Sequence, residues 1–303
     1  MNMNPLLKQL ETLETLSKGT KLTRFLANPV AYTTATFFNY LVYPHTQKGR
    51  SAVAETFFGA KMNVILPAAT DIYLTGGKTH DSETRLAKYL IKHLSEGDAC
   101  LDIGAHFGYF TLLVSEIVGK TGKVMAFEAS TNTFQILKSN VAHRANVSAF
   151  NNALSDKLEV VTFYEFPTLY SEYNSMEIGQ FEDKKWFSRF PPTKIDIQTT
   201  TINDIIDVQG FVPKIIKIDV EGAEYTVVKG ASILANMTNV SIVLEYLTND
   251  ANNSEYIAAS QQLTDYGYQT HIIGDDGNLI KIDDVDAFLK AKKIDSENVV
   301  FVR

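Results

Sequence analysis

The sequence has a single cysteine, no long hydrophobic run and no excess of positive charge. Because Cys100 is the only cysteine among 303 residues, disulfide frameworks and metal sites built from several thiolates are excluded. The first residues lack a basic region followed by an apolar core, so we expect no secretion signal and a cytoplasmic protein. The formal net charge of -7 argues against a nucleic-acid partner, because affinity for a phosphate backbone depends on clustered Lys and Arg.

The first 60 residues differ from the rest of the chain. Leucines at positions 6, 10, 13 and 16 fall near one face of a predicted helix. Residues 25–47 then contain no charged side chain, but they are interrupted by Pro29 and Pro44. A membrane-spanning helix needs about 20 mostly apolar residues, so we expect no transmembrane span. Most amphipathic helices bury their apolar face, so we expect this N-terminal helix to pack on the rest of the chain. The alternative is an arm for a homodimer or for peripheral membrane contact.

Further along, the pattern predicts alternating strands and helices. Residues 62–67 and 71–75 predict a short hairpin, and residues 82–95 predict a helix that Ser82 could cap. Strands are expected over 99–102, 122–128, 148–151, 160–164, 215–218 and 240–246, with a closing hairpin of 268–273 and 298–302. Strands that alternate with helices predict a mostly parallel, doubly wound α/β sheet. We find no internal repeat and no low-complexity tract.

The stretch ACLDIGAHFGYFT (99–111) combines a buried strand, a glycine turn and the start of a helix. Asp102 ends the strand, and Gly104 and Gly108 bracket the turn. Glycine lets a ligand approach the backbone, while the following helix directs unpaired N–H groups at it. The pattern Asp-x-Gly-x-x-x-Gly differs from the Gly-x-Gly-x-x-Gly of dinucleotide-binding domains. It therefore indicates a nucleotide cradle of another kind, with a turn that needs glycine only for its geometry as the alternative.

An acidic residue follows at the distance that such a cradle requires. Residues 122–128 read as the next strand and end in Glu128, 24 positions after Gly104. An acid roughly 20 residues after the glycine turn accepts hydrogen bonds from the ribose hydroxyls of a bound nucleotide. Glu128 is therefore the candidate ribose ligand, and an ordinary solvated acid at a strand end is the alternative.

A third buried strand, residues 215–218, ends in an acidic cluster. The segment KIDVEGAE (217–224) contains Asp219, Glu221 and Glu224. Together with DIGAHFGYFT (102–111) and NALSD (152–156), it strongly resembles the FkbM family of S-adenosylmethionine-dependent methyltransferases. The resemblance runs from about residue 83 to the C-terminus, with the motifs in family order. Two segments depart from the family pattern, namely EAS (128–130) in place of Glu-Pro and TIND (201–204) in place of a Leu-Asp-Asp-like helix start.

The resemblance implies a class I methyltransferase domain over residues 81–303, after a mostly helical extension over residues 1–80. This domain has a Rossmann-like, doubly wound, mixed seven-stranded sheet. The resemblance implies that the methyl donor is S-adenosylmethionine and that the acceptor is usually a hydroxyl oxygen. The aromatic and polar residues between 166 and 195 favour a sugar, glycan or polyketide-like compound as the acceptor. The residues expected to bind the donor are Asp102, Gly104, Ala105, His106, Gly108, Glu128, Ala129, Asn152, Ala153, Leu154 and Asp219.

Methyl transfer to a neutral hydroxyl requires an in-line arrangement of three atoms and a group that accepts the proton. We expect Asp219 to orient the acceptor or the methionine amine, and Glu221 to act as the general base. Glu224 would share a helical face with Glu221, so the pair would raise one carboxyl pKa or hold a divalent cation, although we predict no metal site. Stabilisation of first-turn acids by the helix dipole is the structural alternative. His106 is the other candidate base, with a hydrogen-bonded scaffold role as its alternative.

Residues 166–195 lack periodicity yet hold aromatic side chains, including Tyr170, Tyr173 and Trp186. Loops of this length are usually functional or disordered, and aromatic residues are rare in disordered segments. We therefore expect a substrate lid at about 165–195, with a structural insertion as the alternative. Two other functions stay open from the residues themselves: a nicotinamide-dependent oxidoreductase that uses the same loop and acid, and a non-catalytic binding module with a cofactor fold.

Overall fold

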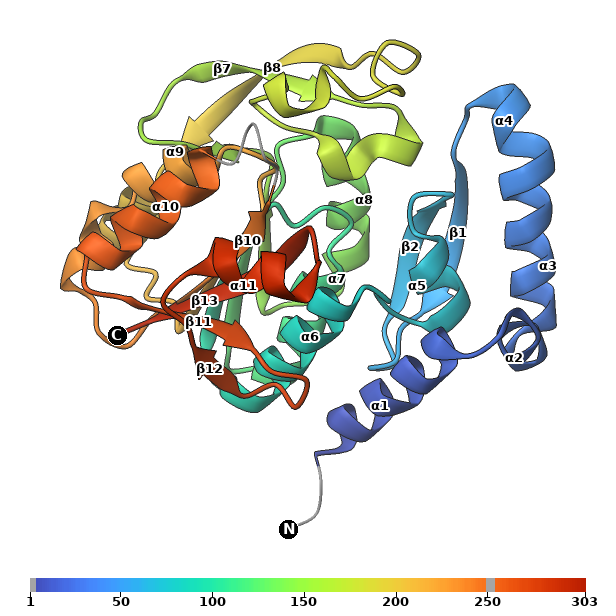
Figure 1. The fold of residues 1–303 in the computed structure, drawn as a ribbon, viewed down its shortest axis with the longest axis horizontal. Helices are drawn as coiled ribbons and strands as arrows, with labels where there is room; N and C mark the ends of the chain where they lie inside the picture. Colours follow the sequence, from blue (N-terminus) through green and yellow to red (C-terminus); the bar gives the residue numbers. More distant parts are fainter. Residues whose placement is uncertain (1–3, 249–253) are drawn as a thin grey trace.

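The computed structural model describes residues 4–248 and 254–303 (Figure 1). Within these residues the main sheet has eight strands, in the order β12-β11-β13-β10-β9-β3-β4-β5. Their bounds are β3 (Ala99–Ile103), β4 (Lys123–Phe127), β5 (Val147–Phe150), β9 (Ile215–Ile218), β10 (Ser241–Leu247), β11 (Gln269–Ile273), β12 (Leu279–Lys281) and β13 (Ser296–Val302). Strands β5, β4, β3, β9 and β10 run parallel, and β13, β11 and β12 continue the sheet antiparallel.

The expected doubly wound, mixed α/β sheet is therefore confirmed, with one strand more than the seven expected. The additional strand is β12, which pairs with β11 at the edge of the sheet. The expected pairing of residues 268–273 with 298–302 is present as β11 and β13. A three-residue edge strand such as β12 is short enough that no alternating pattern marks it in the sequence.

Helices cover both faces of the sheet because its central strands are apolar on both sides. Ile215 belongs to the core under one set of helices, and its neighbour Ile216 belongs to the core under the other set. The first set is α6 (Asp81–His93), α7 (Tyr109–Val118) and α8 (Thr131–Val141). The second set is α9 (Glu224–Lys229), α10 (Ser254–Asp265) and α11 (Val285–Lys292). The short helical turns η4 (Asp204–Val208) and η5 (Ser232–Asn236) cover the same face.

The order of the strands reverses between β3 and β9. The chain runs outward from β3 through β4 to β5 and then returns to β9 on the other side of β3. In open α/β sheets, ligands bind beyond the carboxyl ends of the strands at such a reversal. A three-stranded sheet of β6 (Ala153–Leu154), β8 (Thr193–Thr200) and β7 (Val160–Glu165) stands at one end of the molecule, at the top of Figure 1. The segment between β7 and β8 forms the turns η2 (Thr168–Tyr173) and η3 (Gly179–Phe181).

The N-terminal region consists of helices and one hairpin beside the main sheet (Figure 1). Its elements are α1 (Pro5–Lys18), α2 (Lys21–Ala27), α3 (Pro29–Phe37), the π-helical η1 (Phe38–Val42), α4 (Tyr43–Thr46), β1 (Arg50–Glu55), β2 (Lys61–Leu66) and α5 (Thr70–Thr75). The expected hairpin between residues 62–67 and 71–75 is wrong. Strand β2 pairs with β1, and residues 71–75 form α5, which ends at Gly76 with a φ of 82°. Short apolar runs do not distinguish a strand from a helical turn, which is why the pattern misled.

Part of this region packs on the rest of the chain. Leu10 and Leu13 of α1 and Met62 of β2 share a core with Leu86 of α6 and with α7, so the core crosses residue 80. The helix expected over 82–95 is present as α6, but its cap is His80, and Ser82 lies inside the helix with its hydroxyl hydrogen-bonded to His80 Nδ1 at 2.8 Å. Across the two described ranges, no helix is both long and apolar enough to cross a bilayer.

Candidate functional site

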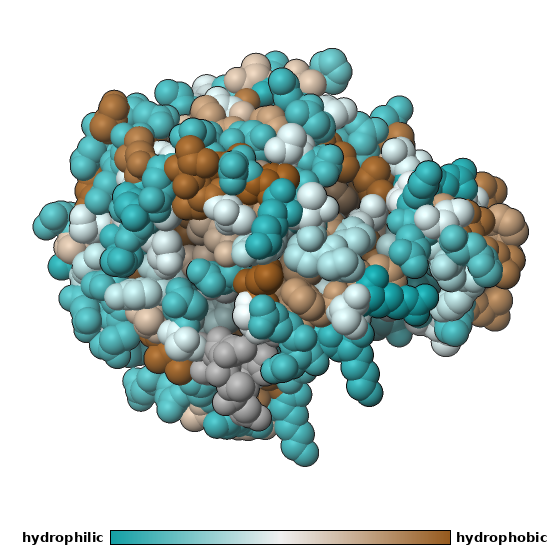
Figure 2. Space-filling view, turned by 90° about the horizontal axis from the view of Figure 1, so that it is seen from above, coloured by the Kyte–Doolittle hydropathy of each residue, from teal (hydrophilic) through white to brown (hydrophobic). Residues whose placement is uncertain are grey.

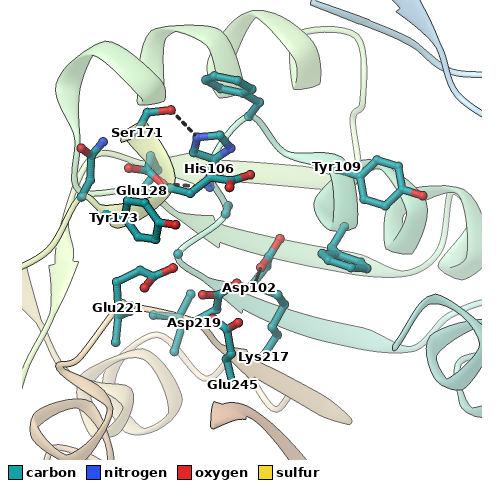
Figure 3. Close-up of a pocket in the computed structure, with 18 of the residues that line it drawn as sticks. Asp102, His106, Tyr109, Glu128, Ser171, Tyr173, Lys217, Asp219, Glu221 and Glu245 are labelled. Carbon is teal, nitrogen blue, oxygen red and sulfur yellow. Dashed lines mark hydrogen bonds and ion pairs between the residues drawn. The ribbon is translucent and has the colours of Figure 1, made fainter. Parts of the chain in front are cut away.

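A cavity of about 620 Å³ opens at the carboxyl ends of the parallel strands (Figure 3). It is lined by Asp102 from β3, Glu128 after β4, Asp219 after β9 and Glu245 from β10. The parallel strands thus bring together carboxylates that are up to 143 positions apart in the sequence. Its volume is typical of sites for small ligands and cofactors.

Gly104 lets the loop after β3 pass directly against the end of β9. Its φ is 78°, and a Cβ at this position would lie 1.7 Å from the carbonyl oxygen of Asp219. The N–H groups of Gly104 and Ala105 both donate to Phe127 O at 3.0 Å, which ties the loop to β4. Gly104 and Ala105 line the cavity, whereas Gly108 is not among its lining residues and instead precedes α7 with a φ of 88°. The second glycine of the motif therefore serves the turn rather than the cavity.

Glu128 is held by the backbone on both sides. Its Oε2 accepts the N–H of His106 at 2.8 Å, and its Oε1 accepts the N–H of Ser130 at 2.9 Å. The side chain is buried, and burial raises its pKa to about 7 against the opposing effect of these two hydrogen bonds. Each oxygen keeps a lone pair, because a carboxylate offers about four acceptor positions. The carboxylate is therefore fixed in orientation and can still accept from a ligand.

Small apolar residues continue the cavity wall beside Glu128. Ala129, Asn152, Ala153 and Leu154 all line it, and Ala153 and Leu154 are buried in the three-stranded sheet and its surroundings. Phe127, at the end of β4, is stacked on Phe150 with ring centroids 4.9 Å apart, which leaves a rigid aromatic support under this wall. A mostly apolar wall with one amide to orient a ligand is typical of small-molecule sites.

Lys217 is a site residue that the sequence reasoning missed. It lies in the middle of β9, is 4% exposed, and lines the cavity. Its Nζ is 2.8 Å from Asp219 Oδ2 and 3.7 Å from Asp102 Oδ1. Although burial opposes it, the carboxylates of Asp219 and Asp102 raise the pKa of Lys217 above its usual value. The available signal was a lysine inside the apolar run IIKID, two residues before an acid and thus on the same face of the strand.

Asp102 is the buried partner of Lys217 in the neighbouring strand. The register of β3 and β9 pairs the two residues directly. Thr111 Oγ1 donates to Asp102 Oδ2 at 2.5 Å, while Oδ1 has no hydrogen-bond partner among the described residues and only the ion pair to Lys217. Burial raises the pKa of Asp102. One buried acceptor atom is therefore left in the lining of the cavity.

Three carboxylates converge where β9 and β10 end. One oxygen each of Asp219, Glu221 and Glu245 lies within 4.8 Å of the others. The carboxyl groups of Asp219 and Glu245 lie close enough that each affects the pKa of the other. Against the effect of burial, Lys217 holds the pKa of Asp219 below its usual value, whereas burial and Asp219 raise the pKa of Glu245. Among the described residues, this set of oxygens is the one place where a cation could meet three carboxylates.

Glu221 has an unusual backbone and an elevated pKa. Its φ is 55°, in the left-handed region, and it precedes α9, which begins at Glu224. The expectation that Glu221 and Glu224 share a helical face is therefore wrong. Burial, followed by the charge of Asp219, raises the pKa of Glu221 well above its usual value. The side chain lines the cavity beside Asp219 (Figure 3).

Glu224 does not take part in this arrangement. Its carboxylate accepts the N–H groups of Val220 at 3.1 Å and Gly222 at 2.9 Å, its exposure is 0%, and it is not among the residues that line the cavity. The tight turn after β9 has backbone donors that need an acceptor, and Glu224 provides it. Its position fits the structural alternative rather than the catalytic role expected for it, and it does not complete a cation site with Glu221.

His106 faces the cavity from the glycine loop. It has a φ of 49°, its ring is stacked on Phe107 at 3.9 Å, and its Nε2 is 3.1 Å from Ser171 Oγ. Burial lowers the pKa of His106 to about 4, so the ring is neutral near pH 7. A neutral imidazole can accept a proton, and this one is also a hydrogen-bonded part of the loop.

The segment expected as a lid contributes directly to the cavity. Ser171, Glu172 and Tyr173 line it, and Glu172 is paired with Lys78 of the N-terminal region at 3.0 Å. Trp186 is stacked on Tyr173 at 5.3 Å and takes part in an aromatic cluster within the segment. The aromatics thus pack on one another, while Tyr173 also points into the cavity (Figure 3). No sequence pattern linked Lys78 to this site, because the contact joins residues 94 positions apart.

A family model described as "Methyltransferase FkbM domain" matches residues 102–270, which is more than half of the chain. The matched range begins at Asp102 and includes Glu128, Lys217, Asp219 and Glu245, the residues whose geometry has just been described. The chain belongs to the FkbM methyltransferase family. The resemblance is thereby confirmed, together with the class of enzyme, a methyltransferase that uses S-adenosylmethionine. A nicotinamide-dependent oxidoreductase is set aside.

Several solved structures are similar to this FkbM methyltransferase in their general arrangement. A putative rRNA methylase from Clostridium thermocellum is 10% identical and has a TM-score of 0.41. The match covers 75% of this chain and 97% of that chain. Fibrillarin from Aeropyrum pernix, with S-adenosyl-L-methionine bound, is 14% identical, with a TM-score of 0.38 and coverages of 72% and 74%. An S-adenosylmethionine-dependent O-methyltransferase from Thermotoga maritima is 14% identical, with a TM-score of 0.38 and coverages of 86% and 80%. No curated protein matches the sequence.

Proposed function

We propose that this FkbM methyltransferase transfers a methyl group to a hydroxyl group of a sugar, glycan or polyketide-like acceptor. The supporting observation is that a single cavity joins the Gly104 loop and Glu128 to the carboxyl cluster of Asp219, Glu221 and Glu245. The first part suits a nucleoside, and the second offers proton acceptors to an attacking hydroxyl.

The residues of the cavity fit the methyl donor. Glu128 would accept from the two ribose hydroxyls, and Ala153 with Leu154 would lie beside the adenine. Asp102, whose Oδ1 is buried without a hydrogen-bond partner in the described chain, offers an acceptor to the methionine end. When bound, S-adenosylmethionine supplies an electrophilic methyl group on a positively charged sulfur. The carboxylates around it favour that positive charge.

Glu221 is our candidate for the group that takes the proton of the acceptor hydroxyl. Its raised pKa makes it a stronger base than an exposed carboxylate once it is ionised. A positively charged ligand in the cavity favours the ionised form. Asp219, kept ionised by Lys217, would orient the acceptor hydroxyl by a hydrogen bond. His106 is the alternative base, although its Nε2 already lies 3.1 Å from Ser171 Oγ.

The remaining polar residues of the cavity, which we call the acceptor wall, suit a polar acceptor. They include Thr70, Asp71 and Lys78 from the N-terminal region, with Glu172 and Tyr173 from the lid segment. Charged and hydroxyl groups beside an aromatic face are the combination that binds a compound with several hydroxyl groups on a ring. This composition supports a sugar-like acceptor over a purely apolar one.

The decisive experiment incubates the enzyme with isotopically labelled methyl donor and a panel of hydroxyl acceptors. With an accepted compound, Glu221→Gln should lower kcat by about 100-fold or more and leave the affinity for S-adenosylhomocysteine nearly unchanged. Because the pKa of Glu221 is raised, kcat of the wild type should increase with pH, and the variant should lose this dependence. Glu182→Gln, at an exposed acid of the lid segment, is the matched control and should stay active.

Two results would contradict parts of this proposal. A fully active Glu221→Gln would remove this residue from the mechanism, and a loss of activity in His106→Ala would then transfer the role of base to His106. Binding of S-adenosylhomocysteine without methyl transfer to any hydroxyl compound would favour the non-catalytic module over the O-methyltransferase.

A further inference from the structure

The outer surface of the N-terminal helices is apolar. Brown side chains gather along the edge of the molecule that these helices form (Figure 2). Six large apolar side chains between positions 22 and 41 are 56–77% exposed, namely Leu22, Leu26, Val30, Phe37, Tyr40 and Leu41. We call these six residues the apolar face. Single exposed apolar residues are ordinary, but a contiguous area on the order of several hundred Å² marks an interaction surface in most proteins.

The apolar face follows from the way in which α3 and η1 are oriented. Val30, Phe37 and Leu41 are spaced by seven and four positions, which places them on one side of the continuous helix. The opposite side carries the small residues Ala31 and Ala35, which are 6% and 1% exposed. Phe38 and Tyr43 are also buried, so the segment already has an inward-facing side, and the large side chains of the apolar face are additional to it.

The chain segment that carries the apolar face has charged residues of one sign only, although Lys18 is paired with Asp81 of α6 at 3.5 Å. Residues 15–54 contain Lys18, Lys21, Arg24, Lys48 and Arg50 and no acidic residue, although the chain as a whole has a net charge of -7. Lys21 and Lys48 are exposed at the two ends of the helical segment. A local excess of positive charge beside an exposed apolar surface complements an anionic lipid headgroup layer.

We propose that the apolar face and its flanking basic residues dock this enzyme on the surface of an anionic lipid bilayer. In this arrangement α2, α3 and η1 lie in the plane of the interface, with the large side chains among the acyl chain ends and the lysines at the headgroups. A second copy of the chain suits this surface less well. A symmetric contact would bring positive charge against positive charge, and residues 15–54 offer no acid to pair with it.

The docking surface is connected to the cavity through the inward side of the same helical segment. Tyr43 OH accepts the N–H of Leu169 in the lid segment at 3.3 Å. Asn39 Nδ2 donates to Thr70 Oγ1 at 3.1 Å, and Thr70 lines the cavity. A bilayer-bound enzyme would therefore hold its lid segment and acceptor wall at a fixed position relative to the lipid surface.

Co-sedimentation of the full chain with vesicles tests this proposal. The wild type should bind vesicles of phosphatidylcholine that contain about one quarter phosphatidylglycerol, bind vesicles of phosphatidylcholine alone more weakly, and be released in part by high salt. Phe37→Ser combined with Leu41→Ser should lower partitioning by about tenfold or more. Val208→Ser combined with Val212→Ser is the matched control, because these valines are 76% and 66% exposed and lie outside the apolar face.

The serine variants should keep the wild-type melting temperature and affinity for S-adenosylhomocysteine, which shows that they are folded. A wild type that does not bind the anionic vesicles overturns the proposal, as does an equal loss of binding in the control pair. Light scattering provides a further test, since a wild-type dimer that the substitutions at Phe37 and Leu41 convert to a monomer would assign the apolar face to a second copy. None of these results bears on methyl transfer to a soluble acceptor, so the proposed function is tested separately.

Discussion

The charged rim of the cavity and the apolar face of the N-terminal helices are opposite exceptions to the usual distribution of side chains. The rim consists of Asp102, Glu128, Lys217, Asp219 and Glu245. At the rim, charged groups are buried, with Asp102 and Lys217 only 2% and 4% exposed. On the apolar face, Val30 and Tyr40 are 77% and 75% exposed. Buried charges cost several kcal/mol unless they are paired, and exposed apolar surface forgoes about 25 cal/mol per Å². Stability alone favours neither arrangement, which is why we propose a ligand at the first region and a bilayer at the second.

The two regions also differ in how the cost is compensated. At the rim, Lys217 lies between Asp102 and Asp219, and backbone N–H groups hold Glu128, so each charge depends on its neighbours. The side chains of the apolar face are exposed, and stability depends little on them. Substitutions at the rim should therefore have large effects, and substitutions on the apolar face should have small effects in solution.

The largest effect is expected from Gly104→Ala. A Cβ would lie 1.7 Å from the carbonyl oxygen of Asp219, at a φ of 78°, so the loop or β9 must move. We expect a loss of about 2–4 kcal/mol in the free energy of unfolding and a drop of about 100-fold or more in S-adenosylhomocysteine affinity. Urea denaturation and calorimetry measure both. Gly179→Ala, where an added Cβ meets no described atom within 4 Å, is the control and should be neutral.

Lys217→Met should be the next most severe substitution. It leaves the buried carboxylates of Asp102 and Asp219 without their positive partner, and we expect a destabilisation of about 3 kcal/mol or more near neutral pH. Lys217 holds the pKa of Asp219 below its usual value against burial. This contribution to stability is present above the unfolded pKa and is lost as pH falls through the folded one. The difference from wild type should therefore shrink below about pH 4.

Urea denaturation of Lys217→Met at several pH values measures this difference. Lys214→Met is the control, since that lysine is about half exposed in its ion pair with Asp98 and should cost about 1 kcal/mol or less. Equal destabilisation at neutral and acidic pH would mean that Lys217 acts through packing, and the contrast between the two regions would weaken.

Glu128→Gln should affect binding more than stability. The amide cannot accept from both the His106 and Ser130 N–H groups as the carboxylate does, so we expect about tenfold weaker binding of S-adenosylhomocysteine. Because burial raises the pKa of Glu128 to about 7, wild-type affinity should improve from about pH 6 to about pH 8 as the carboxylate ionises. Calorimetry should show that the variant lacks this slope, and an unchanged slope would separate Glu128 from the ribose. Glu116→Gln, at the partly exposed pair with Arg144, serves as the control.

The smallest effect is expected from Phe37→Ser. The side chain is 56% exposed on the apolar face, so its removal should change the free energy of unfolding by about 0.5 kcal/mol or less. Thermal unfolding without lipid measures this change. A loss of several kcal/mol would show that the apolar face supports the fold, and the comparison with the rim would fail.

The parts of the site that the sequence predicted are local. The strand, glycine turn and helix around Gly104 and the spacing to Glu128 involve neighbouring elements, so periodicity and turn chemistry were sufficient to find them. Glu224 is absent from the cavity lining for a local reason as well, since the turn after β9 uses its carboxylate for backbone N–H groups. Lys217 was missed because a lysine inside an apolar strand does not fit the pattern of a buried strand. Only the structure shows that Asp102 and Asp219 balance its charge.

The sequence by itself determined the alternation of strands and helices, the glycine turn at residues 104–108 and the family. Each of these depends on short runs of consecutive residues. Only the tertiary structure decided which carboxylates converge in the cavity, that Lys78 meets Glu172, and that the large side chains of α3 point outward. These outcomes depend on contacts between residues far apart in the chain, and on which face of a helix finds a partner. Neither is encoded in local periodicity, because a helix with apolar residues on several sides can pack through any of them.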